Sequence, residues 1–218
     1  MPSWWTMIRR SRRIRRFASV ASGVALLHGC AAQSVDVPPA RVPGPIAARV
    51  GRPGFVVAAP HGGSDVDSDQ IAVEIARRTG FGLVVATGAA RPGPAAYEKR
   101  VLEAAQGPLR FYAEILGHDR QPCAGQIAIA TVGVDRELAL RLRALAELIR
   151  DAHLRARPGI QRLDVLVEPA GAVTGILRLP RQALHIELPR CARRDFRDAY
   201  TAILADFIAQ AVLVPAGR

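Results

Sequence analysis

A histidine and an aspartate lie just beyond a short apolar run near the start of the chain, in the sequence FVVAAPHGGSD of residues 55–65. The apolar run predicts a buried β-strand, and the two glycines after the histidine let the backbone turn sharply. In open α/β sheets, ligands bind beyond the carboxyl ends of the strands. Imidazole nitrogen and carboxylate oxygen are common ligands of catalytic zinc. His61 and Asp65 are therefore candidate zinc ligands, and the alternative is a turn whose polar side chains are only structural.

Two further residues that could take part in the same chemistry lie near later predicted strands. His118 follows a strand predicted over residues 109–116, and Glu187 alternates with apolar residues in a strand predicted over 183–188. A hydrolytic zinc site needs about three protein ligands, an open coordination position and a carboxylate base. The metal lowers the pKa of its bound water to about 7 and polarises the scissile carbonyl. His118 is the candidate third ligand and Glu187 the candidate base; the alternatives are an exposed loop histidine and a solvated strand face.

Arginines near these positions could bind the anionic parts of a substrate. Arg91 lies in a loop predicted over residues 88–94, and Arg190 comes shortly after Glu187. A guanidinium group can neutralise an oxyanion or hold a carboxylate through two hydrogen bonds. Arg91 and Arg190 are therefore candidate catalytic residues, and the expected substrate is a small anionic amide or peptide.

Strand and helix patterns alternate along most of the chain. Strands are predicted over residues 55–59, 81–86, 109–116, 126–132, 163–167 and 183–188, and helices over 67–79, 95–106, 135–155 and 194–213. Such alternation is typical of an α/β domain with a largely parallel or mixed sheet. We therefore expect a single α/β domain with a mixed central sheet and helices on both faces.

Residues 1–29 have the organisation of a secretory signal peptide. Six arginines between positions 9 and 16 precede an apolar stretch over 17–27, which is too short to span a bilayer as a helix. Residues 27–30 (LHGC) then resemble a bacterial lipobox, in which Cys30 would carry the lipid. Cleavage by signal peptidase I and an uncleaved anchor are the alternatives.

A proline-rich segment follows the signal. Prolines recur within residues 30–54, which predicts an extended linker between a lipid anchor on Cys30 and a domain over 55–218. The protein is therefore expected to be exported and lipid-anchored, in the bacterial periplasm or at the outer membrane.

The net charge of +11 gives little support for a nucleic-acid partner. Six of the arginines belong to the signal, which has no acidic residue, so the rest of the chain carries +5. Nucleic-acid binding normally combines clustered basic residues with stacking aromatics. We expect no nucleic-acid partner, and a mild positive charge that suits anionic substrates or an anionic membrane surface.

The chain has three cysteines, and Cys30 would be spent on the lipid. Cys123 and Cys191 then form an even pair in an oxidising compartment, where a disulfide is a reasonable expectation. Two unpaired thiols are the equal alternative. The chain contains no Cys-x-x-Cys spacing, so the sequence does not favour a zinc site built from cysteines.

Three segments together resemble the N-formylglutamate amidohydrolase family, whose fold is similar to that of zinc carboxypeptidases. They are APHGG at residues 59–63, FYAEI at 111–115 with the later Gly117, and LHIELPR at 184–190. Their order and spacing agree over most of residues 55–210.

The resemblance implies a zinc-exopeptidase-like fold and a zinc-dependent hydrolase of N-acyl amino acids or of amide bonds near a glutamyl carboxylate. It also implies His61 as the first Zn²⁺ ligand, Asp65 as the carboxylate ligand and Glu187 as the catalytic glutamate.

Two departures from the family pattern keep a second function open. The family's ligand histidine directly follows Glu-Ile, where this chain has Leu116. His118 could replace it if the strand continues past Gly117, because residues two apart on a strand face the same side. An Asn-Arg-containing segment after the second strand is missing, which leaves only Arg91. The sequence thus predicts an exported zinc-dependent amide hydrolase, and the alternative is a catalytically weakened relative that binds peptides or cell-wall fragments.

Overall fold

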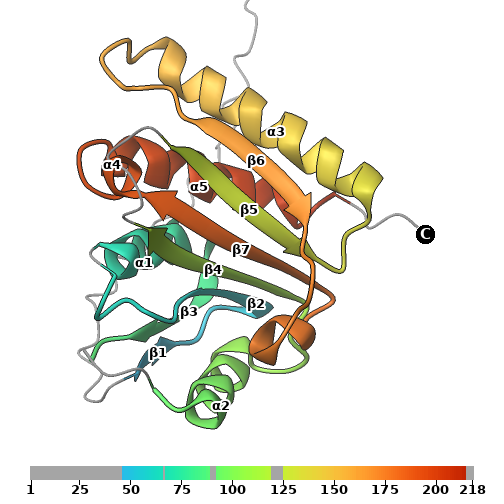
Figure 1. Cartoon of the computed structure of the whole chain (residues 1–218). Helices are drawn as coiled ribbons and strands as arrows, with labels where there is room; N and C mark the ends of the chain where they lie inside the picture. The colour runs from blue at the N-terminus through green and yellow to red at the C-terminus, as the bar shows by residue number, and fades with distance from the viewer. Residues whose placement is uncertain (1–45, 66, 89–91, 119–124, 215–218) are drawn as a thin grey trace, which may run out of the picture. The chain divides into compact units, whose positions relative to one another are not determined.

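The computed structural model describes residues 46–65, 67–88, 92–118 and 125–214. They form a single α/β domain on a seven-stranded sheet (Figure 1). The strands, in spatial order, are β1 (Ile46–Arg49), β3 (Phe81–Ala86), β2 (Arg52–Ala59), β4 (Phe111–His118), β7 (Gln182–Pro189), β5 (Gln126–Val132) and β6 (Asp164–Pro169). β1 pairs antiparallel with β3 and β5 antiparallel with β7, whereas the other four pairs are parallel. The predicted mixed sheet is therefore confirmed.

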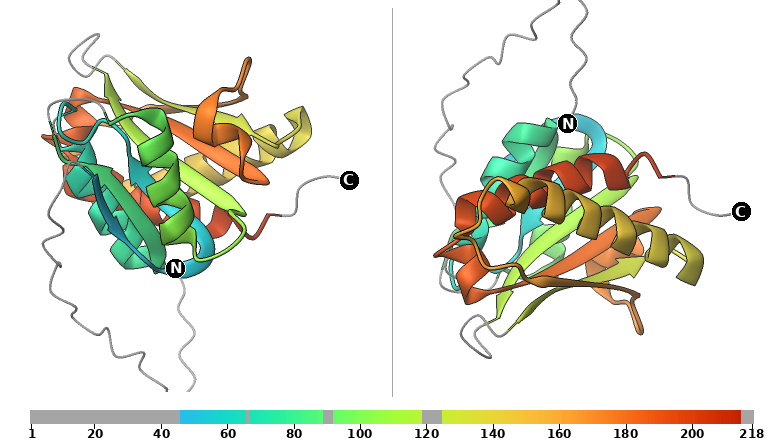
Figure 2. Two further views of the ribbon diagram at one scale, coloured as in Figure 1. Left: turned by 90° about the horizontal axis from the view of Figure 1, so that it is seen from below. Right: turned by 90° about the horizontal axis from the view of Figure 1, so that it is seen from above.

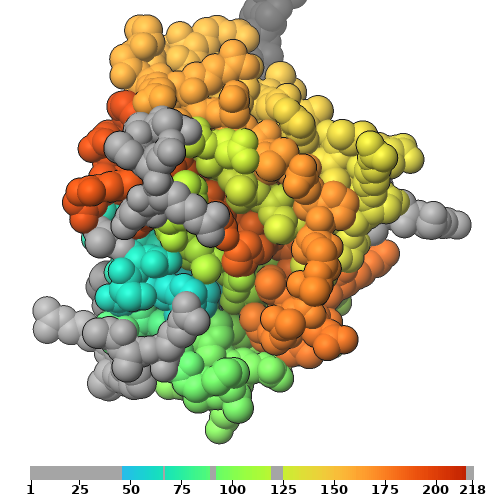
Figure 3. Space-filling view, in the orientation of Figure 1, coloured from blue at the N-terminus to red at the C-terminus, as the bar shows by residue number. Residues whose placement is uncertain are grey.

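Helices cover both faces of this sheet, but unequally (Figure 2). The elements are α1 (Ser68–Thr79), α2 (Pro94–Ala105), α3 (Arg136–Arg155), the 3-10 turn η1 (Gly175–Arg178), α4 (Arg190–Arg193) and α5 (Arg197–Ala211). One face is covered by α1, α3 and α5, where α5 contacts both α1 and α3, and α2 packs over β1, β2 and β3 on the other face. On the side of α2, atoms of β4, β5 and β7 reach the surface (Figure 3). This uncovered part of the sheet leaves room for a site.

Each face of the sheet has its own apolar core. The larger core joins Ile71, Leu142 and Phe207, from the three helices of one face, to inward residues of the strands. The smaller core lies under α2 and contains Val101 and Tyr112. Side chains alternate between the faces along each strand, so every second residue of β4 points toward the side of α2.

The predicted elements agree with observed ones within a few residues, and three further elements, β1, η1 and α4, were not predicted. Strand β1 lies inside the segment 30–54, where a linker was predicted. The helix predicted over 194–213 is observed as α5, and the short helix α4 before it was not predicted. The chain turns between them, where the backbone N–H of Phe196 donates to the carbonyl of Cys191. Strands β3 and β5 have the predicted bounds. Asp135 caps α3 as expected, with its carboxylate accepting from the backbone N–H of Leu138.

Several predicted features fall outside the described residues: the signal peptide, the lipid-bearing Cys30, Arg91 and Cys123. Cys191 is buried and disulfide-bonded. None of the described helices has both the length and the apolar character that a membrane span requires.

Candidate functional site

The turn after β2 holds His61 and Asp65 in one compact loop. The backbone N–H groups of Ser64 and Asp65 both donate to the carbonyl of His61, at 2.8 and 2.7 Å. A Cβ on Gly63 would lie 2.2 Å from the carbonyl oxygen of Gly88, so the turn packs directly against the backbone that follows β3. The glycine predicted to permit a sharp turn is therefore also required by this close approach.

Gly63→Ala is expected to destabilise the protein by about 2–4 kcal/mol, because neither backbone can move without disturbing the ends of β2 and β3. The free energy of unfolding, measured by urea titration, checks this. Gly93→Ala is the matched control, since a Cβ there meets nothing within 4 Å. Equal stability of the two variants would contradict the close packing of the turn.

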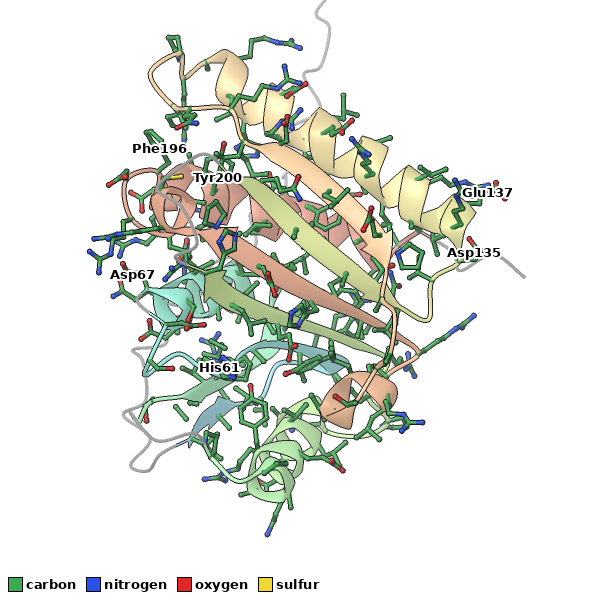
Figure 4. The ribbon with its side chains drawn as sticks, viewed as in Figure 1. His61, Asp67, Asp135, Glu137, Phe196 and Tyr200 are labelled. Atoms are coloured by element: carbon green, nitrogen blue, oxygen red, sulfur yellow. The ribbon has the colours of Figure 1, made fainter. Side chains whose placement is uncertain are left out.

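Asp65 connects the turn to the end of β4. Its Oδ2 accepts a hydrogen bond of 3.0 Å from the backbone N–H of Gly117 and lies 3.9 Å from Nδ1 of His61. Both side chains are about four-fifths buried, with 23% of His61 and 21% of Asp65 exposed. In Figure 4, His61 lies on the side of the molecule where β4 and β7 end. These two candidate ligands are therefore brought together at the carboxyl end of the sheet.

The third candidate ligand, His118, is positioned by β4. The strand continues through Gly117 to His118, so His118 shares a face with Leu116. Its Nδ1 atom is buried and has no hydrogen-bond partner among the described residues. Asp119 lies outside those residues.

These residues do not make up a complete zinc site. Within residues 46–65, 67–88, 92–118 and 125–214, no three His, Cys, Asp or Glu side chains gather closely enough to hold a metal ion. Of the three candidate ligands, His61 and Asp65 lie together, and one oxygen of Asp65 already accepts from Gly117. A catalytic zinc ion needs about three protein ligands, and the described residues bring together only two.

A second polar group lies on the same sheet, across β4 and β7. Glu114 and His185 are register partners on these parallel strands, and Oε1 of Glu114 lies 2.5 Å from Nδ1 of His185. On the other side of the ring, Nε2 of His185 lies 3.4 Å from Oε1 of Glu187. The imidazole therefore lies between two carboxylates, which we call the Glu114–His185–Glu187 array.

Burial increases along this array from Glu187 to Glu114. The side chain of Glu187 is 34% exposed, that of His185 27% and that of Glu114 9%. The second oxygen of Glu114 accepts from the hydroxyl of Tyr112 at 3.1 Å. Burial and the neighbouring Tyr97 and Glu114 raise the pKa of Tyr112 well above its ordinary value, so its hydroxyl stays protonated as a donor. Both oxygens of the buried carboxylate are therefore satisfied, as buried charges require.

The array sets the protonation of His185. The hydrogen bond to Glu114 is the largest cause that raises the pKa of His185 above its ordinary 6.5; burial opposes it, and the charges of Glu114 and Glu187 add to it. The pair favours Nδ1–H donating to Glu114, which leaves Nε2 directed toward Glu187. Such an imidazole can donate a proton, and Glu187 can accept one.

Of the two arginines predicted to bind substrate, only Arg190 lies within the described residues. Arg190 is exposed at the start of α4 and forms no ion pair within the described part of the chain. Arg91 lies outside it. Arg193, which the sequence did not single out, is 2% exposed and donates from Nε to the carbonyl of Leu188. A Cβ on Gly117 would meet its guanidinium at 2.3 Å, so Gly117 makes room for this buried arginine.

The sequence predicted Glu187 as the base of the zinc site. The structure places it in the array with His185, Glu114 and Tyr112, to which the sequence analysis assigned no role. The signal for them was present as two alternating patterns, Tyr112-x-Glu114 in one predicted strand and His185-x-Glu187 in another. Alternation places each pair on one face. Only the register of β4 against β7 shows that the two pairs meet.

Comparisons with known proteins show no family for this chain. No protein-family model matches the chain, and no curated protein matches it. Similar solved structures include a bacteriophage poly-gamma-glutamate hydrolase, at 14% identity over 78% of this chain and 89% of that one, with a TM-score of 0.49. An N-acetylmuramoyl-L-alanine amidase from Clostridium difficile 630 has 16% identity over 74% and 96%, with a TM-score of 0.44.

A metallo-carboxypeptidase from Burkholderia cenocepacia has 13% identity over 78% of this chain and 60% of that one, with a TM-score of 0.41. These proteins are hydrolases by name, and at this level the likeness concerns only the arrangement of strands and helices. Membership of the N-formylglutamate amidohydrolase family stays a prediction. The function of this chain has to come from its own site.

Proposed function

We propose that the protein is a hydrolase of amide bonds in small anionic N-acyl or glutamyl-type substrates. The observation that carries this proposal is the Glu114–His185–Glu187 array, which holds a proton donor and a proton acceptor side by side on the uncovered face of the sheet. General acid–base catalysis by such groups contributes roughly 10²–10⁴-fold to a rate.

The array supplies each proton transfer that amide hydrolysis requires. Glu187 takes a proton from water as the water oxygen bonds to the carbonyl carbon. His185, charged and held by Glu114, donates a proton from Nε2 to the nitrogen as the C–N bond breaks. The proton on Glu187 then returns to His185, which restores both groups. Arg190, which forms no ion pair within the described residues, is available for a substrate carboxylate. Because the donor set of the residues that the structure describes is one ligand short, no step is derived through Zn²⁺.

Glu187→Gln is expected to reduce the turnover of an N-acyl glutamate by about a hundredfold or more, because the water then loses its proton acceptor. Release of free amine from a panel of N-acyl amino acids and γ-glutamyl amides, using the purified chain, measures this. Glu168→Gln is the matched control, because Glu168 is an exposed carboxylate two strands away on β6. Equal loss in both variants, or no turnover of any substrate by the unmodified chain, would reject the proposal.

A second candidate function is binding without turnover. Leu116 occupies the position opposite Glu187 in the register of β4 and β7, and the described donor set has only two neighbouring ligands. A site of this kind could hold a peptide or cell-wall fragment and leave it intact. Saturable binding of such a fragment without amine release would favour this candidate, and turnover that depends on Glu187 would exclude it.

We also propose that the protein is exported and anchored to a bacterial membrane through a lipid on Cys30. The supporting observation is the order of basic segment, apolar stretch and LHGC sequence in residues 1–30. Metabolic labelling with a radioactive fatty acid, in the unmodified chain and in Cys30→Ser, tests it. Equal labelling of the two chains, or none in either, would rule the anchor out.

A further inference from the structure

Arginines lie at the amino ends of three adjacent strands. Arg52 begins β2, Arg110 directly precedes β4 and Arg181 directly precedes β7. These strands are parallel neighbours in the sheet, so the three arginines lie along one edge, opposite the end that carries the His61 turn. All three are exposed, and none forms a salt bridge within the part of the chain that the structure describes.

Two of these arginines, Arg110 and Arg181, come directly before strands that pair with each other. Phe111 and Gln182 are register partners, so the residues before them, Arg110 and Arg181, lie at the starts of two neighbouring strands. Neighbouring strands are spaced by about 4.8 Å. The backbone N–H of Gln182 donates to the carbonyl of Arg110 at 3.2 Å. Like charges on neighbouring strands destabilise a sheet. An anion between the two guanidinium groups would remove this repulsion.

A cavity of about 550 Å³ opens beside the same pair. Its lining combines Arg110 and Arg181 with apolar groups, namely Phe55, Phe111 and the segment 212–214. The ring of Phe55 lies 5.1 Å from that of Phe81 and 6.4 Å from that of Phe111, and the guanidinium of Arg52 lies 4.1 Å from the centre of the Phe55 ring. Ligand cavities of roughly 300–1,000 Å³ with apolar walls and a few polar groups are typical of small-molecule sites.

We propose that this cavity binds a single-chain anionic amphiphile, with the carboxylate of a free fatty acid between Arg110 and Arg181 and its chain over Phe55 and Val212. The charge of the rim selects the anion, and the apolar lining of the cavity accepts the alkyl chain. This site is separate from the Glu114–His185–Glu187 array and does not depend on the proposed hydrolysis.

Isothermal titration of the Cys30→Ser chain with dodecanoate, below its critical micelle concentration, tests the proposal without a competing covalent lipid. Saturable binding is expected, and the double variant Arg110→Ala/Arg181→Ala is expected to weaken it by about tenfold or more, because it removes charge-assisted hydrogen bonds. The matched control is Arg136→Ala/Arg155→Ala, which removes the same charge from the exposed surface of α3.

Three outcomes would overturn the proposal. The first is equal binding of dodecyltrimethylammonium, which has the same chain with the opposite charge. The second is an unchanged affinity for dodecanoate in the Arg110→Ala/Arg181→Ala variant. The third is binding to phosphatidylglycerol vesicles without binding to monomeric dodecanoate, which would make this edge a membrane-docking surface instead of a cavity for one ligand.

Discussion

Leu116→His is expected to raise the affinity of the protein for Zn²⁺ by about a hundredfold or more, which corresponds to about 2.8 kcal/mol. The backbone N–H that follows Leu116 belongs to Gly117 and donates to Oδ2 of Asp65 at 3.0 Å. An imidazole at position 116 therefore begins beside the His61–Asp65 pair and supplies the missing third ligand. Equilibrium dialysis with Zn²⁺ alone measures the affinity.

The control for this prediction is Leu116→Ala, which removes the same apolar side chain without adding a ligand. A double variant, Leu116→His/Asp65→Asn, should lose most of the gained affinity, because the amide is a poorer zinc ligand than the carboxylate. If Leu116→His and Leu116→Ala bind Zn²⁺ equally, the side chain at position 116 does not reach the pair. The two-ligand description of the site would then be wrong.

Elements that depend on local interactions could be predicted from the sequence. Helix α3 has an apolar stripe and a capping aspartate, Asp135, so its start and its length were both predicted. Strand β3 is a buried apolar run with sharp ends. Strand β1 could not be predicted, because only Ile46 among its residues is buried and the strand exists through antiparallel pairing with β3, a contact distant in sequence.

The same difference between local contacts and contacts distant in sequence applies to the candidate site. His61 and Asp65 are four residues apart, and the turn that joins them could be inferred from Gly62 and Gly63. Glu114 and His185 are 71 residues apart, and their contact depends on a register that no single segment encodes. A shift of one residue would turn one of them to the opposite face of the sheet. The most buried part of the array was therefore the part that sequence reasoning missed.

Glu114→Gln is expected to lower the pKa of His185 toward its ordinary value of 6.5, because the neutral amide no longer stabilises the charged ring. Turnover near neutral pH should fall by about tenfold or more, since less His185 is then protonated as the acid. Titration of the imidazole resonances by NMR measures the pKa directly, whether or not the substrate is known. Glu187→Gln is the comparison, because Glu187 lies farther from the ring, at 3.4 Å against 2.5 Å.

The same variant tests the contribution of the array to stability. Because the folded state raises the pKa of His185, its stabilisation is complete below the unfolded-state value near 6.5 and is lost as the pH rises through the folded-state value. The unmodified chain should therefore lose stability across that interval, and Glu114→Gln should lose less over the same interval. An identical dependence of the unfolding free energy on pH in the two chains would mean that Glu114 does not hold the proton on His185. Glu114 would then have no positioning role in the proposed acid–base reaction.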